Sequence, residues 1–498
     1  MRWGNHDVDW SLLSNKSEAI DPLYQAAPLI DKRLGPITSV RTHRVSNDYA
    51  YLHVVTASVR DPAGPNNEPL AEIIAAGGGL TNTRARSAAI GEAIERLSLS
   101  RFQPEQAASP TTSGPANRSI KCCYDELKGE GVNPQSLIHY PTTIYNQPAI
   151  SLQPYDPTMP LYWVKGHYLS DMRPVWVPCF SVYTRYSVGQ DSYFDAVVST
   201  GGACDHEWQK AVISGLYEVV ERDAFTIHWE NRWPTEPLTI PPTMEEVALS
   251  LQKNGFKLFV GQLATDTGIP VALAAVIDES GGKRAALGLG AAARATPEAA
   301  AYRAIEEALL TSFWVTTLLQ ISPLTLNQLR FWMNGLPEPS IHAHLYGFPQ
   351  MREQASFFWA NHQMGIGNQV SGVGDQVTGI GDGYRGRIIS DTQHLTPDTL
   401  SDTQHLTPDT LERSTEMNWL LERIRSTGAE PIVVDVTAEE ARRCGFVVVR
   451  VLIPSFVPLG RGVKVRPLTN QRLRSVPEWF GRKSLADSGF NPDPHPFP

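Results

Sequence analysis

Apolar residues at helical spacing alternate with β-branched, strand-like stretches along most of the chain. Residues 36–60 alternate in a strand-like way and end at a turn region rich in Pro, Gly and Asn. Three long helices are predicted further along. They lie in "GGGLTNTRARSAAIGEAIERLSLSRF" (77–102, a glycine loop followed by a helix that Thr81 or Thr83 caps), "DHEWQKAVISGLYEVVERDAFTIHW" (205–229, with Asp205 as N-cap) and "TPEAAAYRAIEEALLTSFWVTTLL" (296–319).

Strand patterns separate and follow these helices. They are predicted in 140–200, near 257–275, and in "PIVVDVT" and "FVVVRVLIP" after a helix at 415–427. The alternation predicts a mixed α/β (α+β) fold with helices packed on sheets. We expect an N-terminal extension (1–35), a core (36–334), a flexible insertion (335–414) and a C-terminal part of the core domain (415–498) that ends in a proline-rich tail. The insertion contains "SDTQHLTPDTL" twice in tandem, over 390–411.

Composition narrows the class of protein. Hydrophobic residues make up 42% and charged residues 19% of the chain, as in globular proteins. A net charge of −9 without a basic block argues against nucleic-acid binding. No apolar run is long enough for a signal peptide or a membrane span. Five scattered cysteines without a C-x-x-C pair predict neither a disulfide framework nor a zinc site. A cytoplasmic location is the expectation.

The candidate chemistry lies on the three long helices, which carry acidic residues beside arginines. "GEAIERL" contains Glu92 and Glu95, and "YEVVERD" contains Glu218, Glu221 and Arg222, so each helix places two carboxylates at i and i+3 on one face. The third helix carries Arg303, Glu306 and Glu307. Ordinary surface salt bridges would explain any one helix. Three such helices favour a shared cleft in which a hard cation such as Mg²⁺ separates the carboxylates.

Nucleotide phosphates would complete the coordination of that cation, and the arginines would neutralise the transferred phosphoryl group. No G-x-x-x-x-G-K-[ST] motif is present, so the sequence predicts an Mg–nucleotide site without a P-loop. The G-x-G of "LGLGAAARA" (287–295) is only superficially similar to a dinucleotide-binding loop.

These segments, in this order, resemble the YcaO family, whose members use ATP to activate backbone amides. The resemblance covers roughly residues 35–330 and 415–498. It implies the YcaO fold, with ATP and Mg²⁺ held among the helices. By position it implies metal-binding and nucleotide-binding roles for the glutamates and nucleotide-binding roles for Ser87, Ser199 and the arginines. The full set is Ser87, Glu92, Glu95, Ser199, Glu218, Glu221, Arg222, Arg303 and Glu307, with Arg222 also catalytic.

The chain ends "NPDPHPFP", which matches the P-x-P-x-P ending of the azoline-forming members of the family. The resemblance therefore implies a cyclodehydratase that converts Cys, Ser or Thr of a ribosomally made precursor peptide into thiazoline or oxazoline. A stiff polyproline tail would deliver the carboxylate of Pro498 to the site as a base or positioning group. Trimming the tail is expected to abolish turnover and leave the fold intact.

Four polar positions of the family differ here. Ala88 stands where the family has Ser, Gly78 replaces a Lys, Thr200 replaces an Asn, and Leu310 replaces a Gln. Two alternatives therefore stay open: a catalytically silent YcaO-like scaffold or accessory subunit, and another ATP-dependent amide modification such as thioamidation. The partners implied by the family are a separate leader-peptide-binding protein, an azoline dehydrogenase and a second copy of the chain.

Overall fold

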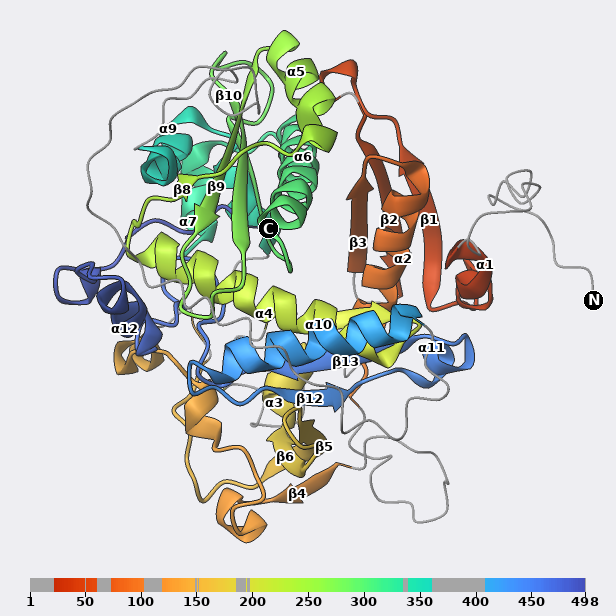
Figure 1. Cartoon of the computed structure of the whole chain (residues 1–498), viewed down its shortest axis with the longest axis vertical. Coiled ribbons are helices and arrows are strands. Elements are labelled where there is room, and N and C mark those ends of the chain that lie inside the picture. Colours follow the sequence, from red (N-terminus) through yellow and green to blue (C-terminus); the bar gives the residue numbers. More distant parts are fainter. Residues whose placement is uncertain are drawn as a thin grey trace, which may run out of the picture.

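The computed structural model describes residues 22–49, 51–60, 73–102, 119–147, 150, 152–184, 194, 198–334, 339–360 and 408–497. It confirms the mixed architecture of helices and sheets. Three sheets surround one long helix, α4 (Trp208–Glu230), which crosses the middle of the molecule in Figure 1. Every ladder between the described strands is antiparallel.

The first sheet is a meander of β1 (Ile37–His43), β2 (His53–Val59) and β3 (Ile73–Gly79). Helix α2 (Asn82–Leu99) packs on it, and its N-cap Thr81 accepts a hydrogen bond from the backbone N–H of Arg84, as predicted. The short helix α1 (Pro22–Ala26) also contacts α2. The predicted glycine loop at 77–79 is wrong, because these glycines end β3, paired with His53–Val55. A Cβ at Gly77 would lie 2.1 Å from the carbonyl oxygen of Ala85, so strand and helix meet backbone to backbone.

The second sheet has the order β11-β10-β9-β8, with α5 (Glu245–Lys253) and α6 (Pro297–Ile321) packed on it. Its strands are β8 (Glu236–Pro237), β9 (Phe256–Leu263), β10 (Val271–Asp278) and β11 (Leu287–Ala293). "LGLGAAA" is therefore a strand and not a nucleotide-binding loop. Gly288 and Gly290 bring β11 against the backbone of α6, since a Cβ at Gly290 would lie 2.4 Å from the nitrogen of Ala308.

The third sheet joins distant parts of the chain in the order β4-β5-β12-β13-β7, with β6 also paired to β5. Its strands are β4 (Ile120–Cys122), β5 (Leu161–Tyr168), β6 (Pro174–Pro178, followed by the short helix α3, Cys179–Val182), β7 (Gly202–Asp205), β12 (Ile432–Asp435) and β13 (Val447–Leu452). Helix α4 packs on β7 and β13. Asp205 is not the N-cap of α4. It ends β7, and its carboxylate accepts the N–H of Glu207, which occupies the N-cap position.

Part of the predicted insertion belongs to the packed core. After α7 (Leu326–Trp332), residues 339–359 form α8 (Pro339–Leu345), α9 (Pro349–Arg352) and a 3₁₀ segment (Glu353–Trp359). Leu345, Met351 and Phe358 are buried in the same cluster as α4, so the packed chain continues well past residue 335. The tandem repeat lies outside the described residues except for its last four, which begin α10 (Pro408–Arg425). The last two α-helices of the described chain are α11 (Glu439–Arg443) and α12 (Arg472–Trp479).

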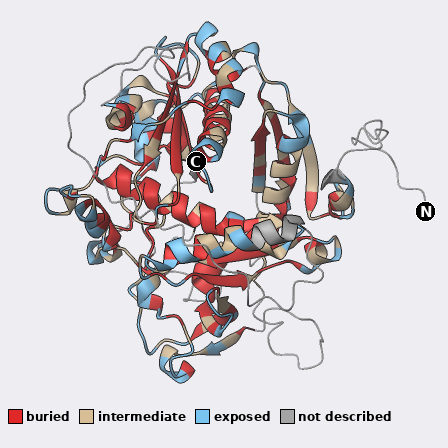
Figure 2. Ribbon diagram, viewed as in Figure 1, coloured by how far each residue is buried: buried red, intermediate tan, exposed pale blue. Residues whose placement is uncertain are grey.

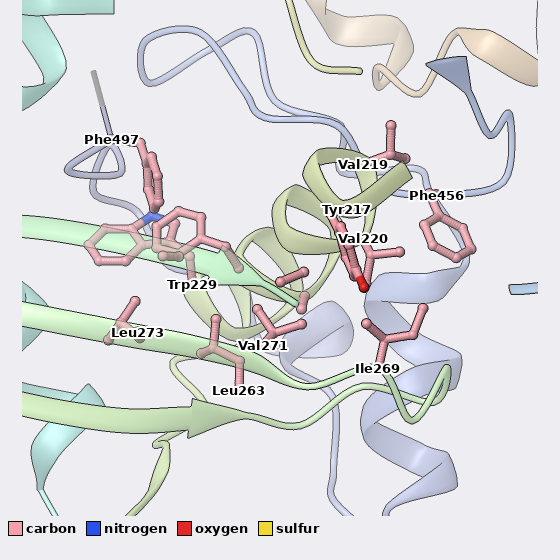
Figure 3. Packing of buried hydrophobic residues seen from close by; sticks show 14 of the residues in the cluster. Tyr217, Val219, Val220, Trp229, Leu263, Ile269, Val271, Leu273, Phe456 and Phe497 are labelled. Carbon is pink, nitrogen blue, oxygen red and sulfur yellow. The ribbon is translucent and has the colours of Figure 1, made fainter. Parts of the chain in front are cut away.

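The largest core cluster collects around α4. Most of this helix is buried (Figure 2), and in Figure 3 its residue Trp229 lies beside Phe497, near Val271 and Leu273 of β10. The three buried aromatic side chains Phe225, Trp229 and Phe497 therefore join the second sheet to the last residues of the chain.

No single helix among the described residues has both the length and the apolarity to cross a membrane. Helices α6 and α7 meet that test only as a pair, by length and composition, and they are bent by 106° at their junction.

Candidate active site

Helices α2, α4 and α6 bring the predicted glutamates into one charged cluster. Electrostatic repulsion connects Glu95 of α2 to Glu92 of the same helix and to Glu218 of α4, and it connects Glu218 and Glu221 to Glu307 of α6. The i, i+3 spacing on α2 and α4 is what turns both carboxylates of each helix toward the same space. The five glutamates predicted from the sequence thus lie together in the structure.

Arg222 is the cation at the centre of this cluster. Its Nε lies 3.3 Å from Glu221 and 3.8 Å from Glu218, and its Nη2 lies 4.0 Å from Glu307. One arginine therefore faces three carboxylates. The distances are longer than those of ordinary hydrogen bonds, so the guanidinium can move toward a ligand. Its buried Nη1 makes no hydrogen bond with the described residues. Such a nitrogen is a donor available to an anion.

The carboxylates of the cluster carry negative charge at a cost, because they are buried close to one another. Burial, with repulsion from Glu218 and Glu92, raises the pKa of Glu95 to about 8. Burial also raises the pKa of Glu221 to about 8, with contributions from Glu307 and Glu218 that oppose the effect of Arg222. The pKa values of Glu218 and Glu307 are raised as well, mainly by burial. Charge of this kind is relieved by a cation.

Backbone N–H groups hold some of these carboxylates in place. Ala76 of β3 donates to Glu92 at 2.9 Å, and Arg96 pairs with the same carboxylate at 2.5 Å. The N–H of Gly201 donates to Glu218 at 3.3 Å. Gly201 has a φ of +82°, and a Cβ there would lie 2.2 Å from the carbonyl oxygen of Val451. Glycine is therefore required where the chain presents this N–H to the site.

The residues suit Mg²⁺ only together with phosphate. No group of three acidic, histidine or cysteine side chains among the described residues is close enough to form a complete metal site. Mg²⁺ in nucleotide sites commonly takes one or two carboxylates and completes its shell with phosphate oxygens and water. A cluster of carboxylates with raised pKa values, beside an arginine that has a free donor, fits that arrangement.

Glu306 and Glu307 are neighbours on α6 with different surroundings. Glu306 is 1% exposed and accepts from Nε of Arg84 at 2.9 Å and from Nη1 of Arg303 at 3.0 Å. Arg303, predicted to bind nucleotide, is thus paired to a structural carboxylate, although its charge also acts on Glu307. Glu306 joins α2 to α6, while Glu307 faces Arg222.

With the residues that the structure describes, neither predicted serine forms a hydrogen bond into the cluster. The Ser87 hydroxyl donates to the carbonyl of Thr83 in its own helix at 2.9 Å. The helical period places Ala88, and not Ser87, on the face of α2 that carries Glu92 and Glu95. Ser199 accepts the N–H of Gly202 through its backbone carbonyl. Their nucleotide-binding roles remain predictions.

Two of the four departures from the family touch each other. A Cβ at Gly78 would lie 3.0 Å from Cβ and Cδ2 of Leu310, so the strand backbone and the leucine are in contact. Leu310 lies one turn after Glu307 on α6. The two changes therefore act as a matched pair that places an apolar contact beside the carboxylates.

Arg450 of β13 is a site residue that the sequence analysis did not single out. It is buried, it donates to the carbonyl of Val198 at 2.8 Å, and its charge lowers the pKa values of Glu95 and Glu218 against the effect of burial. A lone charge within "VVVRVL" was the available signal, since a buried strand rarely contains an arginine without a partner. Arg450 also lines a pocket beside the cluster with Thr200, Val219 and the 451–459 segment.

The tail is packed into the core and is not frayed. Trp229 donates through Nε1 to the carbonyl of Asp493 at 3.1 Å, and the hydroxyl of Tyr346 donates to the carbonyl of Pro494 at 2.5 Å. Nε2 of His495 bonds the carbonyl of Gly460 at 2.8 Å. Phe497 is fully buried, with its ring 4.3 Å from the guanidinium carbon of Arg222. Pro498, predicted to be catalytic, lies outside the described residues.

Fold and site together define a mixed α/β protein in which three long helices bring five glutamates and an arginine into one cluster, and its sequence has no P-loop motif. The chain belongs to the YcaO cyclodehydratase family, described as ATP- and Mg²⁺-binding, whose profile matches residues 76–457. The family predicted from the sequence is therefore confirmed.

Several known proteins are similar to this chain in sequence or in fold. An uncharacterized protein of Methanothermobacter thermautotrophicus is 28% identical over 248 residues, which are 49% of this chain and 58% of that protein. A heterocyclase solved in complex with substrate and cofactor has a TM-score of 0.68 and 18% identity over 95% of this chain and 56% of its own. YcaO from Methanopyrus kandleri, bound with AMPPCP and Mg²⁺, has a TM-score of 0.54 and 19% identity over 86% of this chain and 87% of its own. The chain thus spans little more than half the length of the first two proteins.

Proposed function

We propose that this protein is an ATP-dependent cyclodehydratase that forms azoline rings in a ribosomally made peptide. One observation carries the proposal: the proline-rich tail is packed onto the central arginine of a glutamate cluster that suits Mg–nucleotide. Family membership supports the use of ATP, and the heterocyclase of similar fold supports the type of reaction.

In the proposed reaction, a Cys, Ser or Thr side chain of the substrate attacks the preceding amide carbon. Bound Mg–ATP supplies the phosphoryl group that makes the amide oxygen a leaving group. The attack of the side chain closes the ring and releases the proton of the thiol or hydroxyl to a base. The amide oxygen then departs within inorganic phosphate, the amide nitrogen loses its proton, and a C=N bond forms within the ring. The net products are azoline, ADP and phosphate, so the water removed from the peptide is accounted for.

The chain's own residues position charge in this scheme. The glutamates of α2, α4 and α6 would hold the cation, with Glu92, Glu95, Glu218, Glu221 and Glu307 as candidates. Arg222, with a hydrogen-bond donor to spare, would face the transferred group, and Arg303 would add positive charge nearby. Because Phe497 contacts Arg222, the carboxylate of the next residue, Pro498, is a candidate base for the attacking thiol or hydroxyl.

The proposed partners follow the same logic. A precursor peptide is the substrate, and a separate leader-peptide-binding protein would deliver it, as the family resemblance implies. An azoline dehydrogenase and self-association as a homodimer are further proposals from the family resemblance.

The test combines the protein, a leader-binding partner and a cysteine-containing precursor with Mg–ATP, and follows peptide mass and phosphate release. We expect loss of one water per ring, with one phosphate released for each. Glu307→Gln is the matched inactive control, because it removes one charge from the cluster and preserves shape. ATP hydrolysis with an unchanged peptide mass would contradict the proposal.

A non-catalytic scaffold is the second candidate, and the contact between Gly78 and Leu310 favours it. Both positions are polar in the resembled family, and a leucine offers no hydrogen bond to a nucleotide. Calorimetric titration with Mg–AMPPNP separates the two functions. Binding supports the enzyme, whereas no binding together with retention of the peptide or partner supports the scaffold.

A further inference from the structure

The penultimate residue of the chain makes a specific contact with the central arginine. Phe497 is fully buried, and the Cζ of Arg222 lies 4.3 Å from the centre of its ring. The ring also packs against Phe225, one turn below Arg222 on α4, with centroids 4.3 Å apart and planes inclined by 67°. The ring is therefore held between the charge of Arg222 and an aromatic neighbour.

The contact with Phe497 restrains the guanidinium of Arg222 in addition to the glutamates around it. The carboxylates of Glu218, Glu221 and Glu307 attract its nitrogens at 3.3–4.0 Å, which is too long to fix the guanidinium by hydrogen bonds alone. An aromatic ring attracts a cation electrostatically, and more strongly where water is excluded. Phe497 thus supplies a restraint on Arg222 that the long ion pairs leave open.

The tail itself is anchored well enough to act as a support. Asn491 donates its N–H to the carbonyl of Glu230 at 2.8 Å, and its side chain donates to Trp229 at 3.1 Å. Further along the tail, the hydroxyl of Tyr346 donates to the carbonyl of Pro494, and Nε2 of His495 bonds the carbonyl of Gly460. Alternating prolines reduce the freedom of the segment between these anchors. The position of the ring is therefore set before any ligand binds.

We propose that Phe497 is a positioning residue, whose ring holds the guanidinium of Arg222 in the orientation that faces Glu218, Glu221 and Glu307. The inference rests on the proposed function. It assigns the tail a role through an aromatic side chain, separate from the role of its terminal carboxylate. In the proposed reaction, misplacing Arg222 affects the transfer of the phosphoryl group more than the binding of nucleotide, so kcat falls while KM for ATP changes little.

Two substitutions test the contact. Phe497→Leu removes the ring, and pentafluorophenylalanine incorporated at position 497 preserves its shape but withdraws electron density from its face. For both we expect a loss of kcat of roughly tenfold, with KM for ATP within about twofold of wild type by the same reasoning. Phe497→Trp, which keeps a π-face, serves as the rescue variant. The fluorinated variant keeps the shape of the side chain, so a loss of kcat in this variant cannot be explained by a cavity. Urea unfolding checks that its free energy of unfolding equals that of wild type. A fluorinated variant with wild-type kcat would overturn the proposal.

A measurement independent of turnover separates this inference from the proposed function. In spectra of arginine side-chain N–H groups, the Nε–H signal of Arg222, assigned with Arg222→Lys, should carry a ring-current shift that disappears in Phe497→Leu. If wild type modifies no peptide but the shift is present, the function fails and the contact stands. If the shift is absent from wild type, the positioning role is wrong whatever the activity.

Discussion

At the scale of single residues, the adjacent glutamates Glu306 and Glu307 on α6 have different roles. Glu306 is buried and accepts hydrogen bonds from two arginines, whereas Glu307 faces Arg222 in the glutamate cluster. Glu306→Gln leaves Arg84 and Arg303 with a neutral acceptor, and both arginines are partly exposed. We therefore expect a loss of about 1–3 kcal/mol in the free energy of unfolding.

Glu307→Gln is the control for that prediction, one position along the same helix. It should leave the free energy of unfolding unchanged or raise it, since repulsion is relieved, and it should abolish nucleotide-dependent turnover. Urea denaturation of both variants checks the pair. Equal destabilisation by the two substitutions would show that the division of roles is wrong.

The raised pKa of Glu221 predicts a pH dependence of stability. Its folded pKa is about 8 against an ordinary value of 4.5. Between these values the folded state holds a proton that the unfolded state has lost, so stability falls as pH rises. The buried histidines His228 and His495, whose pKa values are lowered to about 4, act in the opposite direction at acidic pH.

The difference between wild type and Glu221→Gln isolates this effect from the histidines. Relative to the variant, wild type should lose stability progressively from about pH 5 to pH 8 when ligand-free. Unfolding free energies measured at several pH values in that range provide the check. A difference that does not vary with pH would contradict the raised pKa.

At the scale of elements, glycines set how closely strands approach the site helices. Gly77 of β3 meets the backbone of α2, where a Cβ would lie 2.1 Å from the oxygen of Ala85. Gly77→Ala must push α2 away, and with it Glu92 and Glu95. We expect a loss of about 1–3 kcal/mol in stability, as for overpacked cores, with lower nucleotide affinity.

Gly91→Ala is the matched change on the same helix. A Cβ at Gly91 meets nothing within 4 Å, so the substitution should stabilise α2 by about 0.5–1 kcal/mol through helix propensity. Thermal and urea unfolding of both variants test the contrast. If Gly77→Ala is neutral, strand and helix are less closely packed than the structure shows.

At the scale of the whole molecule, the tail packs into the core cluster that surrounds α4. The sequence led to the expectation that trimming the last residues abolishes turnover and leaves the fold intact. That expectation needs correction, because Phe497 is fully buried and Trp229 and Tyr346 bond the tail backbone. Deleting residues 491–498 should cost about 3–5 kcal/mol, as for loss of a buried aromatic side chain, in addition to activity.

The deletion is measured by urea unfolding, alongside Phe497→Leu, which keeps the tail backbone and its hydrogen bonds. The deletion should be clearly the less stable of the two. Equal stabilities would mean that the anchors at Asn491, Asp493 and Pro494 contribute nothing to the fold.

Much of the site was predictable because helical periodicity is local. The i, i+3 pairs on α2 and α4, and the cap at Thr81, follow from spacing within a few residues. The strand that ends in "GGG" was not predicted, because glycines indicate loops. The helices over 339–359 were not predicted either, because the repeat that follows them in the sequence suggested disorder. In both cases tertiary packing overrode the local signal.

The sequence alone determined which residues carry charge, which helices present them, and that the chain ends in a stiff proline segment. Those properties depend on neighbours along the chain. The tertiary structure decided which carboxylate serves as a structural bridge and which faces the cluster, that Gly78 and Leu310 touch, and that Phe497 lies on Arg222. Each of these pairs joins residues that are far apart in the sequence, and only packing of the whole core brings such residues together.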